Sequence, residues 1–141
     1  MKTYYAVIDT NVIVSSFLRH DSLPGRIVDL ATEGTIVPLI NQQILIEYSE
    51  VLSRNKFGLS EEAISRFLAK WTKAGIHLER QKTSLDFADK DDVVFFEVTL
   101  SGRSTMGAYL VTGNLRHYPA ESFVVTPRQM IEIIEKDGNG R

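Results

Sequence analysis

The chain has 141 residues, enough for one domain that buries about two thirds of the surface exposed by its unfolded form. A hydrophobic content of 43% and a charged content of 24% are typical of soluble globular proteins, and no run of about 18 apolar residues predicts a membrane span. The absence of cysteine excludes a disulfide scaffold, a cysteine-ligated zinc site and a thiol nucleophile, while a net charge of −2 gives no strongly basic signature of nucleic-acid binding.

Apolar periodicity, helix caps and turn residues predict strands that alternate with helices along the whole chain. Ser22 and Asn41 are predicted N-caps, and Gly34 and Gly75 are predicted helix ends. In chain order the predicted elements are strand 4–8, helix 11–18, helix 22–34, strand 35–39, helix 41–53, helix 60–75, a weak strand 76–78, a helix that opens at 91–92, strand 106–112, strand 122–125 and helix 127–134.

This alternation is typical of a parallel sheet that helices cover on both faces. We therefore predict an α/β fold, a three-layer α/β/α sandwich with a central parallel sheet. The chain shows no internal repeat or linker, so residues 1–136 are expected to form a single domain and residues 137–141 a loose C-terminal tail. No signal-peptide pattern precedes the first strand, and we expect a cytoplasmic protein.

Asp9 is an acidic residue that follows the first predicted strand directly. In an open parallel sheet, the carboxyl ends of the strands border the crevice in which ligands bind. An aspartate in this position is also a common helix cap, and capping explains Asp9 equally well when the residue is considered alone.

Glu47 lies on the predicted helix 41–53, whose apolar residues define one face at 100° per residue. It falls roughly 100° from the centre of this face, on its flank, whereas Glu50 falls roughly 160° away and faces solvent. Of the two glutamates, Glu47 is therefore the one that can reach a crevice beside the core, although an ordinary surface role is common for such a residue.

Four carboxylates fall within residues 86–92. Acids are favoured at a helix N-terminus, but four exceed what capping requires. Close carboxylates repel one another unless a cation neutralises them, and oxygen-rich acidic sites suit Mg²⁺ or Mn²⁺. Asp92 is our favoured ligand, because it is predicted to lie in the first turn of the following helix.

Residues 112–114 follow strand 106–112 in the same way that Asp9 follows its own strand. Asn114 offers a neutral oxygen and an amide donor, and Thr112 offers a hydroxyl group, although a plain turn also explains the segment. In a doubly wound sheet the polar residues after both strands and the acids on two helices would face one crevice, and we predict the functional site there.

These motifs together resemble the PIN domain family, most closely its small bacterial and archaeal branch of toxin components of toxin–antitoxin pairs. The resemblance covers nearly the whole chain, and the segments that carry it, in matching order and spacing, are 8–15, 47–52, 56–57, 89–95 and 110–114. It implies a PIN-like, Rossmann-like sandwich and an endoribonuclease that depends on a divalent metal ion, Mg²⁺ or Mn²⁺. It also implies RNA as substrate, an antitoxin as a protein partner, and a homodimer.

The resemblance assigns catalytic and metal-binding roles to three acids of this chain, which are Asp9, Glu47 and Asp92. The fourth acid of the family pattern is replaced here by Asn114, also expected at the catalytic site. This departure leaves the second metal position open: Asp89 or Asp91 compensates, or the site holds one ion, or activity is low. A carboxylate-bound ion would activate water for attack on the phosphodiester and stabilise the developing charge.

Neighbouring polar residues are expected to support the site. Thr10, Asn11 and Ser15 could order water around the ion, together with the Thr112 hydroxyl. Arg116 and His117 could contact the RNA backbone. A plain surface role is the alternative for both of these last two residues.

Three other interpretations stay open. Residues 9–12 also resemble the nucleophile motif of phosphatases of the haloacid dehalogenase type, although that motif requires a second aspartate where Asn11 stands. Asn114 favours a PIN-like module that has lost its metal chemistry and binds RNA or a protein partner. Lastly, the acids could serve only solubility and helix capping.

Overall fold

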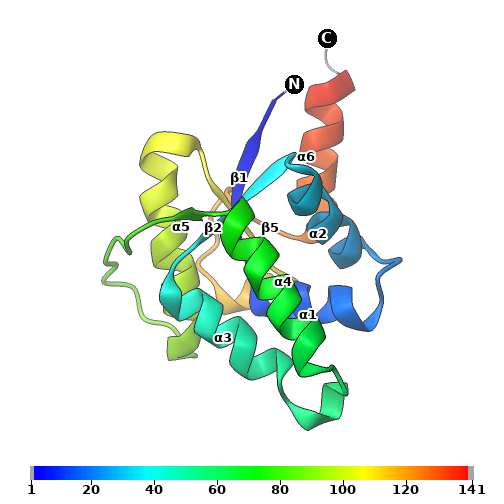
Figure 1. Cartoon of the computed structure of the whole chain (residues 1–141). Coiled ribbons are helices and arrows are strands. Elements are labelled where there is room, and N and C mark those ends of the chain that lie inside the picture. Colours follow the sequence, from blue (N-terminus) through cyan, green and yellow to red (C-terminus); the bar gives the residue numbers. More distant parts are fainter. Residues whose placement is uncertain (1, 140–141) are drawn as a thin grey trace.

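A computed structural model describes residues 2–139 of the chain (Figure 1). Five strands form one sheet in the order β3-β2-β1-β4-β5, and every pairing between neighbours is parallel. The strands are β1 (Tyr4–Ile8), β2 (Ile36–Ile40), β3 (Ile76–His77), β4 (Tyr109–Val111) and β5 (Val124–Val125). The α-helices are α1 (Thr10–Leu18), α2 (Leu23–Glu33), α3 (Gln42–Leu52), α4 (Glu61–Ala74), α5 (Val93–Met106) and α6 (Pro127–Asn139), and the 3-10 helices are η1 (Asn55–Phe57), η2 (Lys90–Asp92) and η3 (Leu115–His117).

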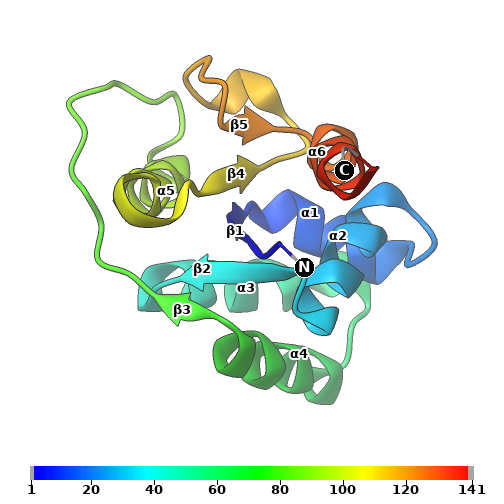
Figure 2. The same cartoon turned by 90° about the horizontal axis from the view of Figure 1, so that it is seen from above.

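The helices cover both faces of the sheet, as predicted. Parallel strands are joined by right-handed crossovers, so the connections from β1 to β2 and from β2 to β3 place α1 to α4 on one face. The chain then returns across the sheet, and α5 packs against β1, β2 and β4 on the opposite face (Figure 2). The predicted α/β/α sandwich is therefore confirmed.

The centre of the sheet is its most apolar part. Ala6, Val7 and Ile8 of β1 have no exposed surface, which fits a strand that is covered on both faces. The hydroxyl group of Tyr48 on α3 donates to the carbonyl oxygen of Ile8 at 2.5 Å. This bond fixes α3 against the end of β1, directly before Asp9.

A long irregular segment, residues 78–89, carries the chain from β3 to η2 and α5 across the edge of the sheet (Figure 2). Glu97 of α5 anchors it: this carboxylate is only 4% exposed, and it accepts from Arg80 Nε at 2.7 Å and from the backbone N–H of Thr83 at 2.8 Å. The segment therefore has a fixed course although it forms no regular element.

Several boundaries differ from the sequence prediction. Met106 ends α5 and does not begin a strand, because Gly107 adopts φ 61° and closes the helix in the left-handed conformation. The strand predicted at 106–112 is therefore shortened to β4. Helix α6 continues past its predicted end at Ile134.

The C-terminal residues 137–139, which the sequence assigned to a loose tail, belong to α6. Asp137 accepts from Lys2 Nζ at 3.1 Å and from the Tyr4 hydroxyl at 2.6 Å, so this end of the helix is tied to the start of β1. The last two residues of the predicted tail, 140 and 141, lie outside the described residues. No helix within residues 2–139 has the length and apolar character needed to cross a bilayer.

Candidate functional site

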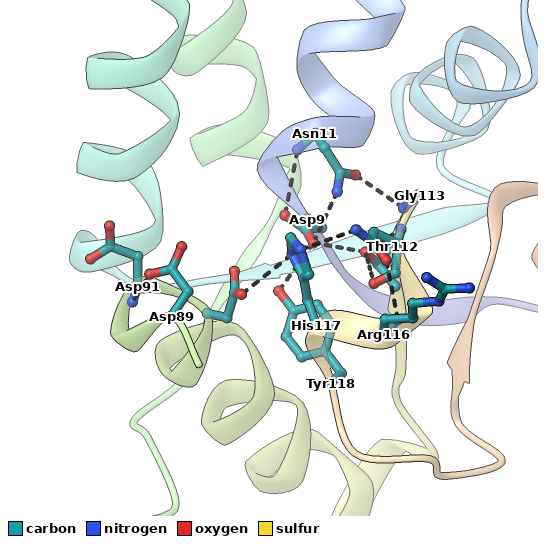
Figure 3. Close-up of polar contacts among 11 residues, drawn as sticks. Asp9, Asn11, Asp89, Asp91, Thr112, Gly113, Arg116, His117 and Tyr118 are labelled. Carbon is teal, nitrogen blue, oxygen red and sulfur yellow. Dashed lines mark hydrogen bonds and ion pairs between the residues drawn. The ribbon is translucent and has the colours of Figure 1, made fainter. Parts of the chain in front are cut away.

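Asp9 and Thr112 lie side by side because their strands are neighbours in the sheet. The register pairs Ile8 of β1 with Val111 of β4, so the residue after each strand emerges at the same edge. The backbone N–H of Asp9 donates to the carbonyl oxygen of Val111 at 2.9 Å, and the Thr112 hydroxyl donates to Asp9 Oδ2 at 2.8 Å (Figure 3). The two motifs that the sequence placed after separate strands therefore meet.

Three side chains orient the carboxylate of Asp9, which is only 5% exposed. In addition to Thr112, the Tyr118 hydroxyl donates to Oδ2 at 3.1 Å and Asn11 Nδ2 donates to it at 3.4 Å. By contrast, Oδ1 receives one long contact, from the backbone N–H of Asn11 at 3.4 Å. Burial raises the pKa of Asp9 above its ordinary value, and these hydrogen bonds oppose the shift.

Asn11 also links α1 to the loop after β4. Its Oδ1 accepts from the backbone N–H of Gly113 at 3.0 Å. A Cβ atom at Gly113 would lie 3.2 Å from the same oxygen, so a larger residue would crowd this contact. The Asn11 side chain, which the sequence predicts to order water around an ion, thereby bridges Asp9 and Gly113.

Asp92 lies at the junction of η2 and α5, and its side chain is 13% exposed. Burial, followed by the charges of Asp9 and Asp89, raises the pKa of Asp92 to about 6. His117 opposes this shift, with Nδ1 3.5 Å from Asp92 Oδ2. Because carboxylates repel over short distances, the influence of Asp9 on Asp92 places both in one negatively charged region.

Glu47 lies half-buried on the flank of α3, whereas Glu50 is exposed, as their helical positions predicted. Burial raises the pKa of Glu47, and the charges of Asp91, Glu50 and Asp89 raise it further. Glu47 in turn contributes to the raised pKa of Asp92. Each of the three predicted acids therefore interacts electrostatically with at least one other member of the set.

Asp9, Glu47 and Asp92 carry oxygen donors of the kind that bind Mg²⁺ or Mn²⁺. Within residues 2–139, no three Asp, Glu or His side chains lie close enough together to surround an ion directly. Mg²⁺, however, usually keeps several of its waters and binds through only one or two carboxylates. Asp9 Oδ1 and the carboxylate of Asp92 are hard oxygen ligands. Burial raises the pKa of both groups, and for Asp92 the charges of Asp9 and Asp89 add to the shift.

The Asn114 side chain contacts η3 and His117. It caps η3, where Oδ1 accepts from the backbone N–H of Arg116 at 3.2 Å. The Nδ2 group lies 3.0 Å from His117 Nε2. The side chain of Asn114 therefore contacts His117, which in turn contacts Asp92, while its backbone N–H donates to the Thr112 hydroxyl at 3.1 Å.

The other predicted residues differ in exposure and contacts. Thr10 is buried, and its hydroxyl has no hydrogen-bond partner within residues 2–139. Ser15 is exposed and borders a shallow depression of about 200 Å³ together with Pro24. Asp89 caps η2 by accepting from the backbone N–H of Asp91 at 2.9 Å, and both of these aspartates are exposed.

Tyr118 is the residue of this site that the sequence prediction missed. Its hydroxyl reaches Asp9 across 109 positions of the chain. Burial and the charge of Asp9 raise the pKa of Tyr118, so the hydroxyl keeps its proton and donates. No spacing or motif in the sequence indicates this role, because it depends on the turn of η3 that brings Tyr118 next to Asp9.

Comparisons with known proteins agree with this architecture. A sequence model of the PIN domain matches residues 5–116. The chain is 28% identical, over 145 aligned positions, to the uncharacterized protein MJ1680 of Methanocaldococcus jannaschii, with coverage of 92% of this chain and 91% of that protein. The crystal structure of PAE2754 from Pyrobaculum aerophilum matches with a TM-score of 0.57 at 14% identity, covering 94% of this chain and 90% of that one, a likeness of fold alone.

Proposed function

Because the chain belongs to the PIN domain family, whose members are generally nucleases, we propose that it is an endoribonuclease dependent on Mg²⁺ or Mn²⁺. Asp9, Glu47 and Asp92 are the proposed metal-binding and catalytic residues. The observation that carries this proposal is the setting of Asp9, whose three side-chain partners gather on Oδ2 and leave Oδ1 with one long backbone contact, and whose charge acts on Asp92.

The bound ion and the residues around it would have different roles in cleavage. The bound ion would activate water and stabilise the charge that develops on the phosphate. Thr112 and Tyr118 hold the Asp9 carboxylate in one orientation, as partners of metal ligands commonly do. The acids alone would repel a polyanion, so binding of RNA close to them requires the cation.

Two depressions flank the acids and offer a path for a nucleic-acid strand. One, of about 270 Å³, is lined by Glu47 and Asp91 together with the basic residues Arg80 and Lys90. The ammonium group of Lys90 suits contacts with the phosphates of the RNA backbone, whereas Arg80 is paired with Glu97. The other is the 200 Å³ depression beside Ser15, which carries uncharged polar groups. Arg116, exposed on η3, is a further candidate for a phosphate contact.

Cleavage of single-stranded RNA in the presence of Mn²⁺ tests the proposal. We expect Asp9→Asn to abolish cleavage, and EDTA to abolish it in the unchanged protein. Asp86→Asn is the matched control, because Asp86 is an exposed aspartate of the same acidic segment. Cleavage that survives both Asp9→Asn and EDTA would refute a metal-dependent nuclease.

A second candidate function is a PIN-like module that binds RNA or a protein without cleaving it. The presence of asparagine at position 114, where the family pattern has an acid, favours this alternative. RNA binding without cleavage in the unchanged protein, under Mn²⁺, would support it. Absence of any Mn²⁺ binding heat above that of Asp9→Asn would instead mean that the acids serve solubility and capping. The phosphatase interpretation is not retained, because the chain belongs to the PIN domain family.

A toxin role, with an antitoxin partner, a homodimeric state and a cytoplasmic location, completes the proposal. It rests on the resemblance of the motifs. Co-expression with the product of a neighbouring small reading frame tests the partner: the complex should form and RNA cleavage should cease. Sedimentation equilibrium tests the dimer, and a monomer at micromolar concentration would contradict it.

A further inference from the structure

The amide of Asn114 has a defined orientation. A backbone N–H can only donate, so the atom of Asn114 that lies 3.2 Å from the backbone nitrogen of Arg116 must be the amide oxygen. The amide nitrogen therefore faces His117, with Nδ2 3.0 Å from Nε2. The Thr112 hydroxyl, which accepts from the backbone N–H of Asn114 at 3.1 Å, holds the same turn in place.

This orientation selects one tautomer of the neutral imidazole. An amide NH₂ group has only hydrogens to offer, so Nε2 of His117 must accept through its lone pair. The ring proton is then on Nδ1, the nitrogen that lies 3.5 Å from Asp92 Oδ2. At this distance the contact is electrostatic in character, and it directs a positive N–H edge at the carboxylate.

We propose that Asn114 is a positioning residue that fixes His117 as its Nδ1–H tautomer, and that His117 in turn orients Asp92. The inference deepens the proposed function, because it assumes that Asp92 binds the ion. Hydrogen-bonded partners of metal ligands commonly set both the orientation and the affinity of those ligands.

The chemistry explains why an asparagine suits position 114. An aspartate of the same size could only accept from His117, so it would draw the ring proton to Nε2. Asn114 therefore has a positioning role in the site and is not merely a lost fourth ligand.

Nuclear magnetic resonance of ¹⁵N-labelled imidazoles tests the tautomer directly in metal-free protein. The chain has three histidines, so His20 and His77 serve as internal references. At about pH 8 we expect His117 in its Nδ1–H form. Asn114→Asp should remove that form while the His20 and His77 signals stay unchanged. An Nε2–H form in the unchanged protein, or the same tautomer in Asn114→Asp, would overturn the inference.

Calorimetric titration with Mn²⁺ tests whether His117 acts through Asp92. We expect His117→Ala to weaken Mn²⁺ binding about 10-fold or more, and His20→Ala, which removes an exposed histidine elsewhere, to leave it unchanged. The side chains of His117 and His20 are 48% and 75% exposed, so neither change should unfold the chain. Equal Mn²⁺ affinity in His117→Ala and the unchanged protein would overturn the positioning role alone. No Mn²⁺ binding by the unchanged protein would overturn the proposed function and this role together.

Discussion

Replacement of Asp92 by asparagine should stabilise the metal-free chain while it weakens the response to Mn²⁺. The pKa of Asp92 is raised to about 6, against an ordinary value of 3.8 for aspartate. Ionisation of Asp92 is therefore less favourable in the folded chain than in the unfolded chain. An asparagine at this position would keep the shape of the side chain without this penalty.

The size of the effect follows from the pKa difference. At about 1.4 kcal/mol for each pH unit, the difference amounts to about 3 kcal/mol, which we reduce to about 1–2 kcal/mol because solvent screens part of the carboxylate's interactions. For a chain of this size, that gain raises Tm by about 3–6 °C.

The sign of the pH dependence is also defined. Because the folded pKa exceeds the unfolded one, the stability associated with Asp92 is fully present below about pH 3.8 and is lost as the pH rises through about 6. Asparagine does not titrate. The advantage of Asp92→Asn should therefore grow between these pH values and stay constant above them.

Thermal unfolding followed by circular dichroism measures this effect, in EDTA at about pH 8 and at about pH 4. Asp86→Asn, an exposed change in the same acidic segment, should leave Tm unaltered at both pH values. Millimolar Mn²⁺ should raise Tm of the unchanged protein, because a ligand that binds only the folded state stabilises it. With Mn²⁺ present, Tm of the unchanged protein should then exceed that of Asp92→Asn. A loss of more than about 1 kcal/mol for Asp92→Asn in EDTA at about pH 8 would show that the carboxylate is held by favourable partners, and would refute the reasoning.

Three further predictions concern the same network and its support. Mn²⁺ affinity, measured by calorimetry, should fall about tenfold for each pH unit below pH 6, because a proton on Asp92 competes with the ion; a flat profile between pH 5 and 7 would contradict this. Tyr118→Phe removes a donor to Asp9 and should weaken Mn²⁺ binding about 10-fold with Tm lowered by only a few degrees, and equal affinity would exclude the orienting role. Glu97→Gln removes the charge that pairs with Arg80 and should lower the free energy of unfolding in urea by about 2 kcal/mol. Residues 78–89 should also be cleaved faster by a protease. Unchanged stability would mean that this pair does not anchor the segment.

Local signals in the sequence predicted most of the fold. The apolar run 4–8, the caps Ser22 and Asn41 and the helix end at Gly34 all act over a few residues, so they can be recognised without a structure. The end of α5 was misplaced because Met106 suits a helix or a strand equally well. Gly107, in its left-handed conformation, decides the boundary.

The site was predictable only where topology brings strand ends together. Asp9 and Thr112 follow strands, so a parallel sheet was enough to place them at one edge, and the helical position of Glu47 distinguished it from Glu50. The role of Tyr118 and the contacts of His117 could not be predicted. They depend on how the 3-10 helix η3 places these two residues next to Asp9 and Asp92, and no periodicity in the sequence predicts this placement.

Anomalous diffraction from crystals grown with Mn²⁺ tests most directly whether the acids gather to hold a cation. We predict a peak at the manganese absorption edge beside Asp9 Oδ1 and the carboxylate of Asp92, absent from crystals of Asp9→Asn. Crystals without a manganese peak near these two residues, at Mn²⁺ concentrations that support cleavage of RNA, would contradict the account.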